Sequence, residues 1–320
     1  MSSYASRGLD VKILMFGRGA IASIYGWALR EAGHQVEFYV RPGRASEYGD
    51  TIRLDLLDAR RRPLGKQVAG PVPVELRETL SPTDGIDLII VSVAHHRLTA
   101  AAEFLAPRIG DATVLVFGNV WAEPLDAIRP LPAAQVVWGF PRAGGGFGDG
   151  GTLSGVLLRE VVFGTLGDTP NGRNLATWAV FEHANFRVRQ VEDFRGWLWL
   201  HFIADAGMHA QGLHFGTLSM LIGNRRGLRD ALLTTRELLP LLEARGIDLR
   251  RHRRSMLQFQ APTWLIAPLM AWATSHVGVA HASLQAHADP DATEPRVVRD
   301  HALSEARSHG IPVTRLAAAP

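Results

Sequence analysis

The sequence predicts an α/β protein whose N-terminal half is a doubly wound parallel sheet and whose C-terminal half is entirely helical. Over residues 12–117, short apolar runs alternate with helical spacing, which is typical of a parallel sheet covered by helices on both faces. After the turn cluster Asp168–Gly172 the spacing is almost all helical. We therefore predict one domain over residues 1–170 and a second over residues 171–320.

The elements of the N-terminal half each have a local signature. Lys12–Phe16 is a short apolar run that predicts a buried strand, and glycines and the helically spaced segment Ile21–Ala32 follow at once. Gln35–Val40 predicts a second strand, so this stretch forms a βαβ unit. Two further buried strands are predicted at Ile86–Val93 and Thr113–Phe117.

The later part of the chain has a different character. The glycine-dense segment Gly144–Gly151 predicts a loop. Beyond the boundary, helices are predicted over Leu175–His183, Phe194–Leu213, Leu228–Arg245 and from Trp264 onward.

Composition excludes several classes of function. The 320 residues are 47% hydrophobic and 20% charged, which is typical of a globular protein. The chain has no cysteine, so disulfides and thiolate sites are excluded. The longest apolar runs, Leu88–Val91 and Val114–Phe117, are too short to span a membrane, and Met1–Asp10 has no apolar core of a signal peptide. We expect a cytoplasmic protein with no membrane partner.

Charge argues against a nucleic-acid partner. The net charge is +3, and the basic residues are dispersed apart from Arg60–Arg62 and Arg250–Arg254. Short runs of this kind usually form solvated faces. The partner that we expect is therefore a small molecule.

The turn after the first strand points to a dinucleotide. Gly17-Arg18-Gly19-Ala20-Ile21-Ala22 fits the pattern G-x-G-x-x-G/A. Gly17 permits the tight turn, Gly19 lets the backbone approach a pyrophosphate, and Ala22 lets the helix pack closely on the strand. The helix start then presents N–H groups to the anion. The alternative is a purely structural turn, but the strand before and the helix and strand after it favour a Rossmann-type cofactor site.

The end of the second strand indicates which dinucleotide is bound. NAD-specific sites place an acidic residue there, whereas this strand ends at Val40 and continues with Arg41 and Arg44. An arginine can pair with a 2′-phosphate through its planar fork. Glu37 lies too early in the strand for the ribose role. We therefore predict NADPH as the cofactor, the alternative being solvated loop arginines.

With these residues in place, the sequence resembles the ketopantoate reductase family over nearly the whole chain. Lys12–Ala22 looks like the opening strand and phosphate turn of that family, and Arg41 matches its NADP-selecting arginine. Further matches lie at Gly118-Asn119-Val120, Ser283-Leu284-Gln285, Thr293-Glu294 and Gly310-Ile311-Pro312.

The resemblance implies a fold and a reaction. The fold is a Rossmann-type domain followed by an all-helical domain, a 6-phosphogluconate-dehydrogenase-like arrangement with the active site in the cleft between. The reaction is hydride transfer from NADPH to the ketone of a 2-oxo acid. The resemblance places Asn119 near nicotinamide and substrate and gives Glu294 a hydrogen bond to substrate. The cofactor residues implied are Gly17, Arg18, Gly19, Ala20, Ile21, Ala22, Arg41, Arg44, Val93 and Asn119.

The chain departs from the family where the family has its acid. The catalytic lysine position is His201, and no lysine exists beyond Lys66. The two asparagine positions that follow are Asp205 and His209. The carboxylate-binding serine falls on Ala282, with Ser283 adjacent, and a lysine after the Ile86–Val93 strand is replaced by Ala94, with His95 and His96 beside it.

The substituted residues have three interpretations, which the sequence leaves open. Because His201, Asp205 and His209 are four apart, they line one helix face. In the first interpretation, His201 is the general acid and Asp205 holds its ring. In the second, the three bind a metal, although they stretch over two turns. In the third, they form a polar helix face without a catalytic role.

Three functions follow. The first is an NADPH-dependent reductase of a carbonyl compound, with His201, Asp205, Asn119 and Glu294 as catalytic residues and with His209, Ser283 and Glu294 against the substrate. The second is an imine or opine-type reductase, and the third is a non-catalytic NADPH-binding regulatory protein. Glu294 also suits a helix N-terminus, since Pro295 follows it. The C-terminal helices predict either a homodimer face or packing within the subunit.

Overall fold

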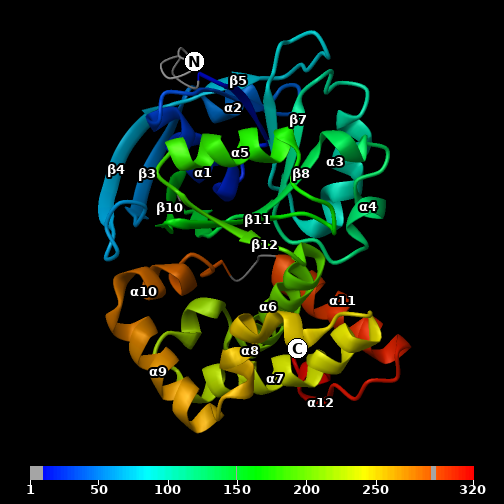
Figure 1. Cartoon of the computed structure of the whole chain (residues 1–320). Coiled ribbons are helices and arrows are strands. Elements are labelled where there is room, and N and C mark those ends of the chain that lie inside the picture. The colour runs from blue at the N-terminus through cyan, green and yellow to red at the C-terminus, as the bar shows by residue number, and fades with distance from the viewer. Residues whose placement is uncertain (1–9, 149, 290–292) are drawn as a thin grey trace, which may run out of the picture. The chain divides into compact units, whose positions relative to one another are not determined.

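The computed structural model describes residues 10–148, 150–289 and 293–320. The chain forms two compact units (Figure 1). The sheet unit comprises the described residues up to Gly118 together with Ala122–Glu192, and the helical unit comprises Asn119–Trp121 and Asp193–Pro320. Across the described residues, no helix has the length and apolar character needed to cross a bilayer.

The sheet unit is built on an eight-stranded sheet in the order β12-β11-β8-β7-β6-β1-β2-β5. All neighbouring strands are parallel except β8 and β11, and Met15 of β1 lies between Phe38 of β2 and Ile90 of β6. This is the predicted doubly wound Rossmann-type sheet. Its strands are β1 (Lys12–Phe16), β2 (Gln35–Tyr39), β5 (Glu75–Arg77), β6 (Leu88–Val91), β7 (Thr113–Phe117), β8 (Val136–Phe140), β11 (Glu160–Gly164) and β12 (Arg187–Val191).

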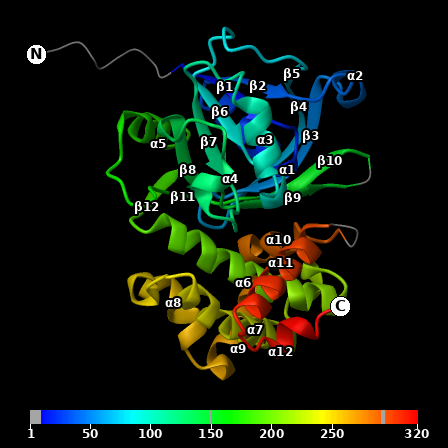
Figure 2. The ribbon, with the colours of Figure 1, turned by 90° about the vertical axis from the view of Figure 1, so that its right-hand side faces the viewer.

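Helices cover both faces of this sheet, which explains why β6, β7 and β8 are buried at every residue. Tyr25 of α1 and Phe181 of α5 join one core cluster with the sheet, whereas Phe104 of α3 packs on the rings of Phe16 and Tyr39. Figure 2 labels α1, α3 and α5 beside the strands that they cover. The helices are α1 (Ala20–Glu31), α2 (Ala45–Tyr48), η1 (His95–Arg97), α3 (Leu98–Leu105), α4 (Pro124–Ala127), η2 (Ala133–Gln135) and α5 (Gly172–His183).

A second sheet, in the order β4-β3-β10-β9, corrects one prediction. Residues 144–147 of the predicted loop form most of strand β9, because glycine allows a very close approach to β10. A Cβ atom on Gly155 would lie 2.3 Å from the Gly144 carbonyl oxygen. The strands are β3 (Thr51–Asp58), β4 (Lys66–Pro73), β9 (Ala143–Phe147) and β10 (Thr152–Leu157).

The sheet unit continues beyond residue 170, because α5 packs in its core and β12 pairs with β11. The helical unit is centred on α6 and α7, which lie close together at Gly207. A Cβ atom there would lie 2.7 Å from the Ala231 carbonyl oxygen. Its elements are α6 (Phe194–Phe215), η3 (Leu218–Leu221), α7 (Arg225–Ala244), η4 (Leu249–His252), α8 (Arg253–Gln260), α9 (Thr263–His276), α10 (Gly278–Gln285), α11 (Glu294–Ser308) and α12 (Thr314–Ala317).

The helical unit also holds the segment Asn119–Trp121, which follows β7 in the chain. The Trp121 ring stacks on Phe202 of α6 with 4.5 Å between centroids, and the Arg245 guanidinium lies over it at 4.0 Å. Arg245 Nη2 also donates a hydrogen bond to the Trp121 carbonyl at 2.8 Å. These contacts fix Asn119 next to α6.

Candidate functional site

The glycine turn has the geometry that a dinucleotide site needs. Gly17 has φ +99°, a left-handed conformation that favours glycine, and its N–H donates to the Tyr39 carbonyl at 3.0 Å. Gly19 is the N-cap of α1, and no side chain caps the helix. Ala22 is buried, as the close packing of α1 requires.

The space above this turn fits a pyrophosphate. A Cβ atom built on Gly17 or Gly19 would meet no protein atom within 4 Å. The first N–H groups of α1, from Ala20 and Ile21, have no helical acceptor and carry the positive end of the helix dipole. An anion placed over the turn would therefore receive backbone hydrogen bonds without displacing any side chain.

Arg18 lies in the turn, but aromatic rings hold its side chain. The guanidinium lies 4.9 Å from the centroid of Tyr48 and 5.3 Å from that of Phe147, and Nη2 donates to the Thr51 carbonyl at 3.1 Å. Arg44 lies over the same Tyr48 ring. Sequence reasoning missed Tyr48, because nothing in the local pattern marks it as the ring that both arginines share.

The two arginines after β2 differ in how they are held. Arg41 is exposed and forms no ion pair within the described residues. Arg44 forms an ion pair with Glu47 at 2.6 Å and donates to the Tyr48 hydroxyl at 3.2 Å. Arg41 is thus the arginine whose charge has no carboxylate beside it.

Glu78 shapes the loop that carries these arginines, and the sequence analysis did not find it. Its carboxylate accepts the N–H of Ala45 at 2.7 Å. Backbone N–H groups of Ala45 and Gly43 lower the pKa of Glu78 below its ordinary value. Glu37 of β2 is engaged elsewhere, in ion pairs with Lys12 at 3.3 Å and Arg77 at 2.9 Å.

The loops that follow β6 and β7 lie side by side. A Cβ atom on Gly118 would be 3.7 Å from the carbonyl oxygen of Val93, which is half-buried. His95 and His96, which follow Val93 and Ala94, form η1 with an edge-to-face ring contact at 5.6 Å. Val93 therefore belongs to the same rim of the sheet as the end of β7.

A polar cluster lies on α6 in the helical unit, and Asp205 is at its centre. Asn119 Nδ2 donates to Asp205 Oδ2 at 2.8 Å, and His201 Nε2 lies 3.5 Å from the same oxygen. Asn119 Oδ1 is buried and accepts no hydrogen bond within the described residues. The structure thus brings together three of the four predicted catalytic residues.

The ring of His201 has an aromatic partner on its own helix. Trp197, one turn earlier on α6, stacks on it with 5.4 Å between centroids and planes 12° apart. The contact fixes the plane of the imidazole. The signal in the sequence was the i, i+4 spacing of an aromatic and a histidine, which brings two side chains into contact on one helix face.

His209 and Glu294 extend the cluster. His209 is buried, its Nδ1 has no hydrogen-bond partner within the described residues, and burial lowers its pKa to about 4. Glu294 keeps exposed surface, yet the surrounding protein atoms reduce the hydration of its carboxyl and raise its pKa. The Asp205 carboxylate adds to that rise, and His287 opposes it.

Ser283 uses its hydroxyl within its own helix. Oγ donates to the Val279 carbonyl at 2.9 Å, one turn back on α10, and within the described residues it forms no hydrogen bond to the cluster. His287 joins α10 to the cluster instead, with its ring 6.4 Å from that of His209. Across the described residues, no three His, Asp or Glu side chains are grouped as ligands for a metal ion.

Comparison with known proteins identifies the sheet unit. Residues 13–165 match the family model of ketopantoate reductase PanE/ApbA. The match shows that these residues are similar to that family. The matched segment runs from the first strand and its glycine turn to the end of β11 and does not include α5 or β12, and the proteins of this family are oxidoreductases. No curated protein sequence matches the chain.

Solved structures show the same fold over the whole chain. The ternary structure of D-mandelate dehydrogenase with NADH and anilino(oxo)acetate has a TM-score of 0.67 at 15% identity, covering 96% of this chain and 95% of its own. The 2-dehydropantoate 2-reductase from Geobacter metallireducens has a TM-score of 0.66 at 15% identity, covering 97% of each. The PanE/ApbA family ketopantoate reductase from Ralstonia eutropha has a TM-score of 0.63 at 20% identity, covering 96% of this chain and 95% of its own. Rossmann-type sheet and C-terminal helices are therefore shared by all four.

Proposed function

We propose that the protein is an NADPH-dependent reductase of a carbonyl compound, similar to 2-dehydropantoate 2-reductase but with another general acid and another substrate. The observation that supports this most is the row Asn119, Asp205 and His201. It provides a proton-bearing imidazole and a fixed counter-charge in a chain whose residues 13–165 are similar to an oxidoreductase family. Both are what carbonyl reduction requires of a protein.

The cofactor proposal is supported by the turn and by one arginine. The open space over Gly17 and Gly19 suits a pyrophosphate, and Arg41 suits a 2′-phosphate because no carboxylate neutralises it. Arg44, which Glu47 already neutralises, serves to hold Tyr48 and the loop. When bound, NADPH supplies the hydride that reduces the carbonyl carbon.

In the proposed chemistry, His201 neutralises the charge that develops on the carbonyl oxygen. Imidazolium with a reference pKa of about 6.5 is a stronger acid at neutral pH than a lysine with about 10.4, so it can replace the family lysine. Asp205 stabilises the positive ring, and Trp197 holds its plane. His201 Nε2 carries the proton that passes to the oxygen.

Two further residues orient the substrate. Asn119 Oδ1 is a buried acceptor without a partner, so a hydroxyl or amine of the substrate would satisfy it. Glu294, whose pKa is raised above the ordinary value because protein atoms reduce the hydration of its carboxyl, would hydrogen-bond the substrate. His209 stays neutral at pH 7 and lines the cluster as a polar wall.

The test is NADPH consumption over a panel of ketones and 2-oxo acids by wild type, His201→Ala and His214→Ala. His214 is an exposed histidine on the same helix and serves as the matched control. We expect kcat to fall about 10²- to 10⁴-fold in His201→Ala alone, with NADPH affinity retained. Unchanged turnover in His201→Ala would remove the acid role. NADPH binding without turnover of any panel member would point instead to a regulatory protein.

The charge of the cluster favours one second candidate, the reduction of an imine. Asp205 and Glu294 are carboxylic acids, His209 is neutral at pH 7, and these described contacts include no lysine or arginine. A protonated imine is a cation, which Asp205 would attract. It also arrives with its proton, so it needs no strong general acid.

Asp205→Asn separates the two candidates. This change keeps an acceptor for Asn119 and removes the negative charge. For an imine reductase we expect KM for a cyclic imine such as pyrroline to rise by about tenfold, whereas for a carbonyl reductase kcat falls and KM is maintained. Asp230→Asn is the control, because Asp230 lies on α7 and its carboxylate pairs with Arg315 of α12.

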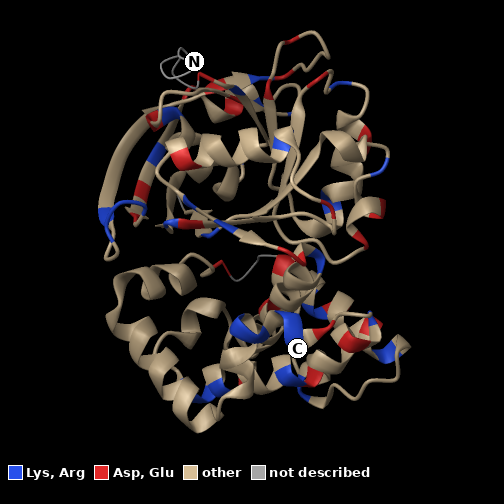
Figure 3. Cartoon of the chain, in the orientation of Figure 1, with Lys and Arg blue, Asp and Glu red and all other residues tan. Residues whose placement is uncertain are grey.

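We also propose that the protein forms a homodimer through α9. Trp264, Leu265, Leu269 and Trp272 of this helix are each more than half exposed, and residues 261–288 contain no charged side chain (Figure 3). An apolar surface without charge matches an identical surface better than a polar partner. Sedimentation should show a dimer in wild type and a monomer in Trp272→Glu. A monomeric wild type would contradict the proposal.

A further inference from the structure

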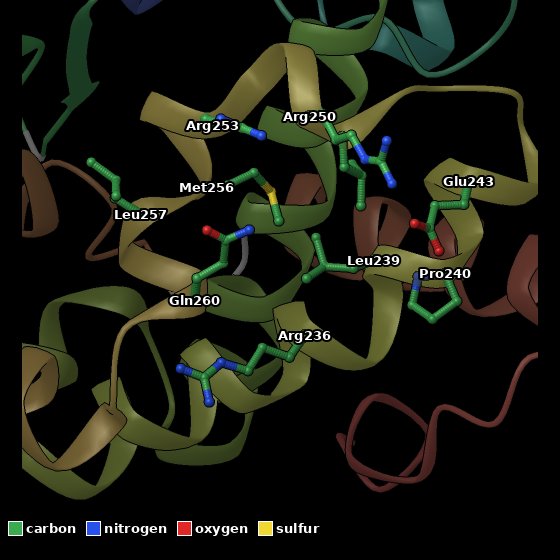
Figure 4. Close-up of a pocket in the computed structure, with 10 residues that line it drawn as sticks. Arg236, Leu239, Pro240, Glu243, Arg250, Arg253, Met256, Leu257 and Gln260 are labelled. Atoms are coloured by element: carbon green, nitrogen blue, oxygen red, sulfur yellow. The ribbon is translucent and has the colours of Figure 1, made fainter.

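A pocket of about 620 Å³ lies in the helical unit, among residues that neither the glycine turn nor the polar cluster uses. Side chains from α7, η4 and α8 surround it (Figure 4). Its volume falls in the range of small-molecule sites. It is lined by Arg236, Leu239, Pro240, Glu243, Leu249, Arg250, Arg253, Met256, Leu257 and Gln260.

The charge of this pocket is positive and is only partly neutralised by its own lining. Arg236, Arg250 and Arg253 face one carboxylate, that of Glu243. Within the described residues, no ion pair engages any of the three arginines. Because unpaired guanidinium groups around one cavity favour an anion, the charge points to a ligand with a carboxylate or phosphate.

Arg236 gives a second indication. Its Nη2 donates to the Ala261 carbonyl, which holds the side chain in place, while its Nε is buried and has no partner within the described residues. Pro240 lies inside α7 and has no N–H, so the carbonyl of Arg236, four residues earlier, loses its helical donor. A residue in the pocket wall thus keeps a buried donor without a partner, which an anionic ligand or water that reached it would satisfy.

The remaining lining is apolar. Met256 is almost fully buried, Leu239 and Leu249 are half-buried, and Leu257 has 64% of its surface exposed. Hydration of an exposed leucine is unfavourable, so an alkyl or ring group of a ligand that packs on Leu257 would be stabilised. Apolar side chains and guanidinium groups in one pocket are complementary to an amphiphile.

We propose that this pocket binds a small organic anion: a carboxylate or phosphate head that Arg250 and Arg253 contact, joined to an apolar body that packs on Met256 and Leu257. The site is separate from the residues assigned to reduction and does not depend on that assignment. Arg236 is held at the pocket wall and adds a third positive charge. An inorganic anion alone would leave the apolar lining in contact with water.

The test is calorimetric titration of the full chain with octanoate and octyl phosphate, which distinguish the two head groups. Inorganic phosphate tests the head alone, and octanol tests the tail alone. We expect at least one of the two amphiphiles to bind at least about tenfold more tightly than either fragment. Equal binding of octanol, equal binding of inorganic phosphate, or no heat with any amphiphile would each overturn the proposal.

Two double variants localise the site. Arg250→Gln with Arg253→Gln should weaken the bound amphiphile at least about tenfold, which corresponds to about 1.4 kcal/mol. Arg251→Gln with Arg254→Gln removes the same charge from the same segments but from residues outside the pocket lining. It should change affinity less than about twofold. Equal losses in both pairs would mean general attraction by a basic surface and would refute the pocket.

Discussion

The glycine turn of the sheet unit is formed by backbone groups, whereas the polar cluster of the helical unit is formed by side chains. The turn offers backbone N–H groups and open space, and it is open because Gly17 and Gly19 have no side chains. The cluster is made of side chains four residues apart on α6, and its chemistry changes with each residue. A substitution in the glycine turn is therefore expected to act by adding side-chain atoms to the open space. A substitution in the polar cluster is expected to act by changing the chemical group at that position.

Adding atoms at Gly19 should have the largest effect. Its φ of −71° suits any residue and its Cβ position is open, so Gly19→Val is expected to fold normally. The branched side chain would occupy the space assigned to the pyrophosphate. We expect NADPH affinity, measured by fluorescence titration, to fall about thousandfold or more, equivalent to about 4 kcal/mol.

Gly172 provides the control for that experiment. It begins α5, and a Cβ atom there also meets nothing within 4 Å. Gly172→Val should leave NADPH affinity unchanged and the melting temperature close to that of wild type. If Gly19→Val binds NADPH as wild type does, the open space over the turn is not the cofactor site.

Burial of His209 in the polar cluster should make the free energy of unfolding depend on pH. His209 stays neutral in the folded protein until about pH 4, whereas in the unfolded chain it binds a proton near pH 6.5. Because the unfolded state then binds more protons, the free energy of unfolding should decrease as the pH falls from about 6.5 to about 4, by up to about 3 kcal/mol.

Urea unfolding of wild type and His209→Gln at several pH values measures this term. Glu294, with its raised pKa, contributes in the opposite direction, so the difference between the two proteins is the informative quantity. The variant should lose less stability than wild type between pH 6.5 and pH 4. Parallel curves for the two proteins would show that His209 is not held neutral by burial.

We expect the smallest effect at Arg41, the one side chain of the sheet unit to which we assign the choice of cofactor. Arg41→Ala should lower the affinity for NADPH about tenfold and leave the affinity for NADH unchanged. The reason is that the arginine pairs with the 2′-phosphate, which NADH lacks. Arg44→Ala removes an arginine that is already paired with Glu47, so it should lower the affinity for NADPH less than Arg41→Ala does. Equal affinity of Arg41→Ala and wild type for NADPH would mean that Arg41 does not select the cofactor.

Prediction from sequence succeeded where a local pattern carries the structure. Strand β1, the turn and α1 follow from apolar period, glycine and helical spacing within about twenty residues. The loop predicted at Gly144–Gly151 was wrong over β9, because the pairing of β9 with β10 depends on how closely two glycine-rich backbones approach. No local signal encodes that approach.

The candidate site divides along the same line. The i, i+4 spacing placed His201, Asp205 and His209 on one helix face, and the structure adds the hydrogen bond from Asn119 to Asp205, 86 residues apart in sequence. Tyr48 and Glu78 were missed for the same reason, since each acts on residues that only folding brings near.

By itself, the sequence determined the α/β class, the glycine turn at Gly17 and the helical face that carries His201. Each of these depends on interactions within one turn, strand or helix, which neighbouring residues decide. The tertiary structure alone decided that Asn119 joins Asp205, that burial lowers the pKa of His209, and that Arg44 has an ion-pair partner among the described residues while Arg41 has none there. Burial and charge pairing are sums over atoms from distant segments, so only the folded chain defines them.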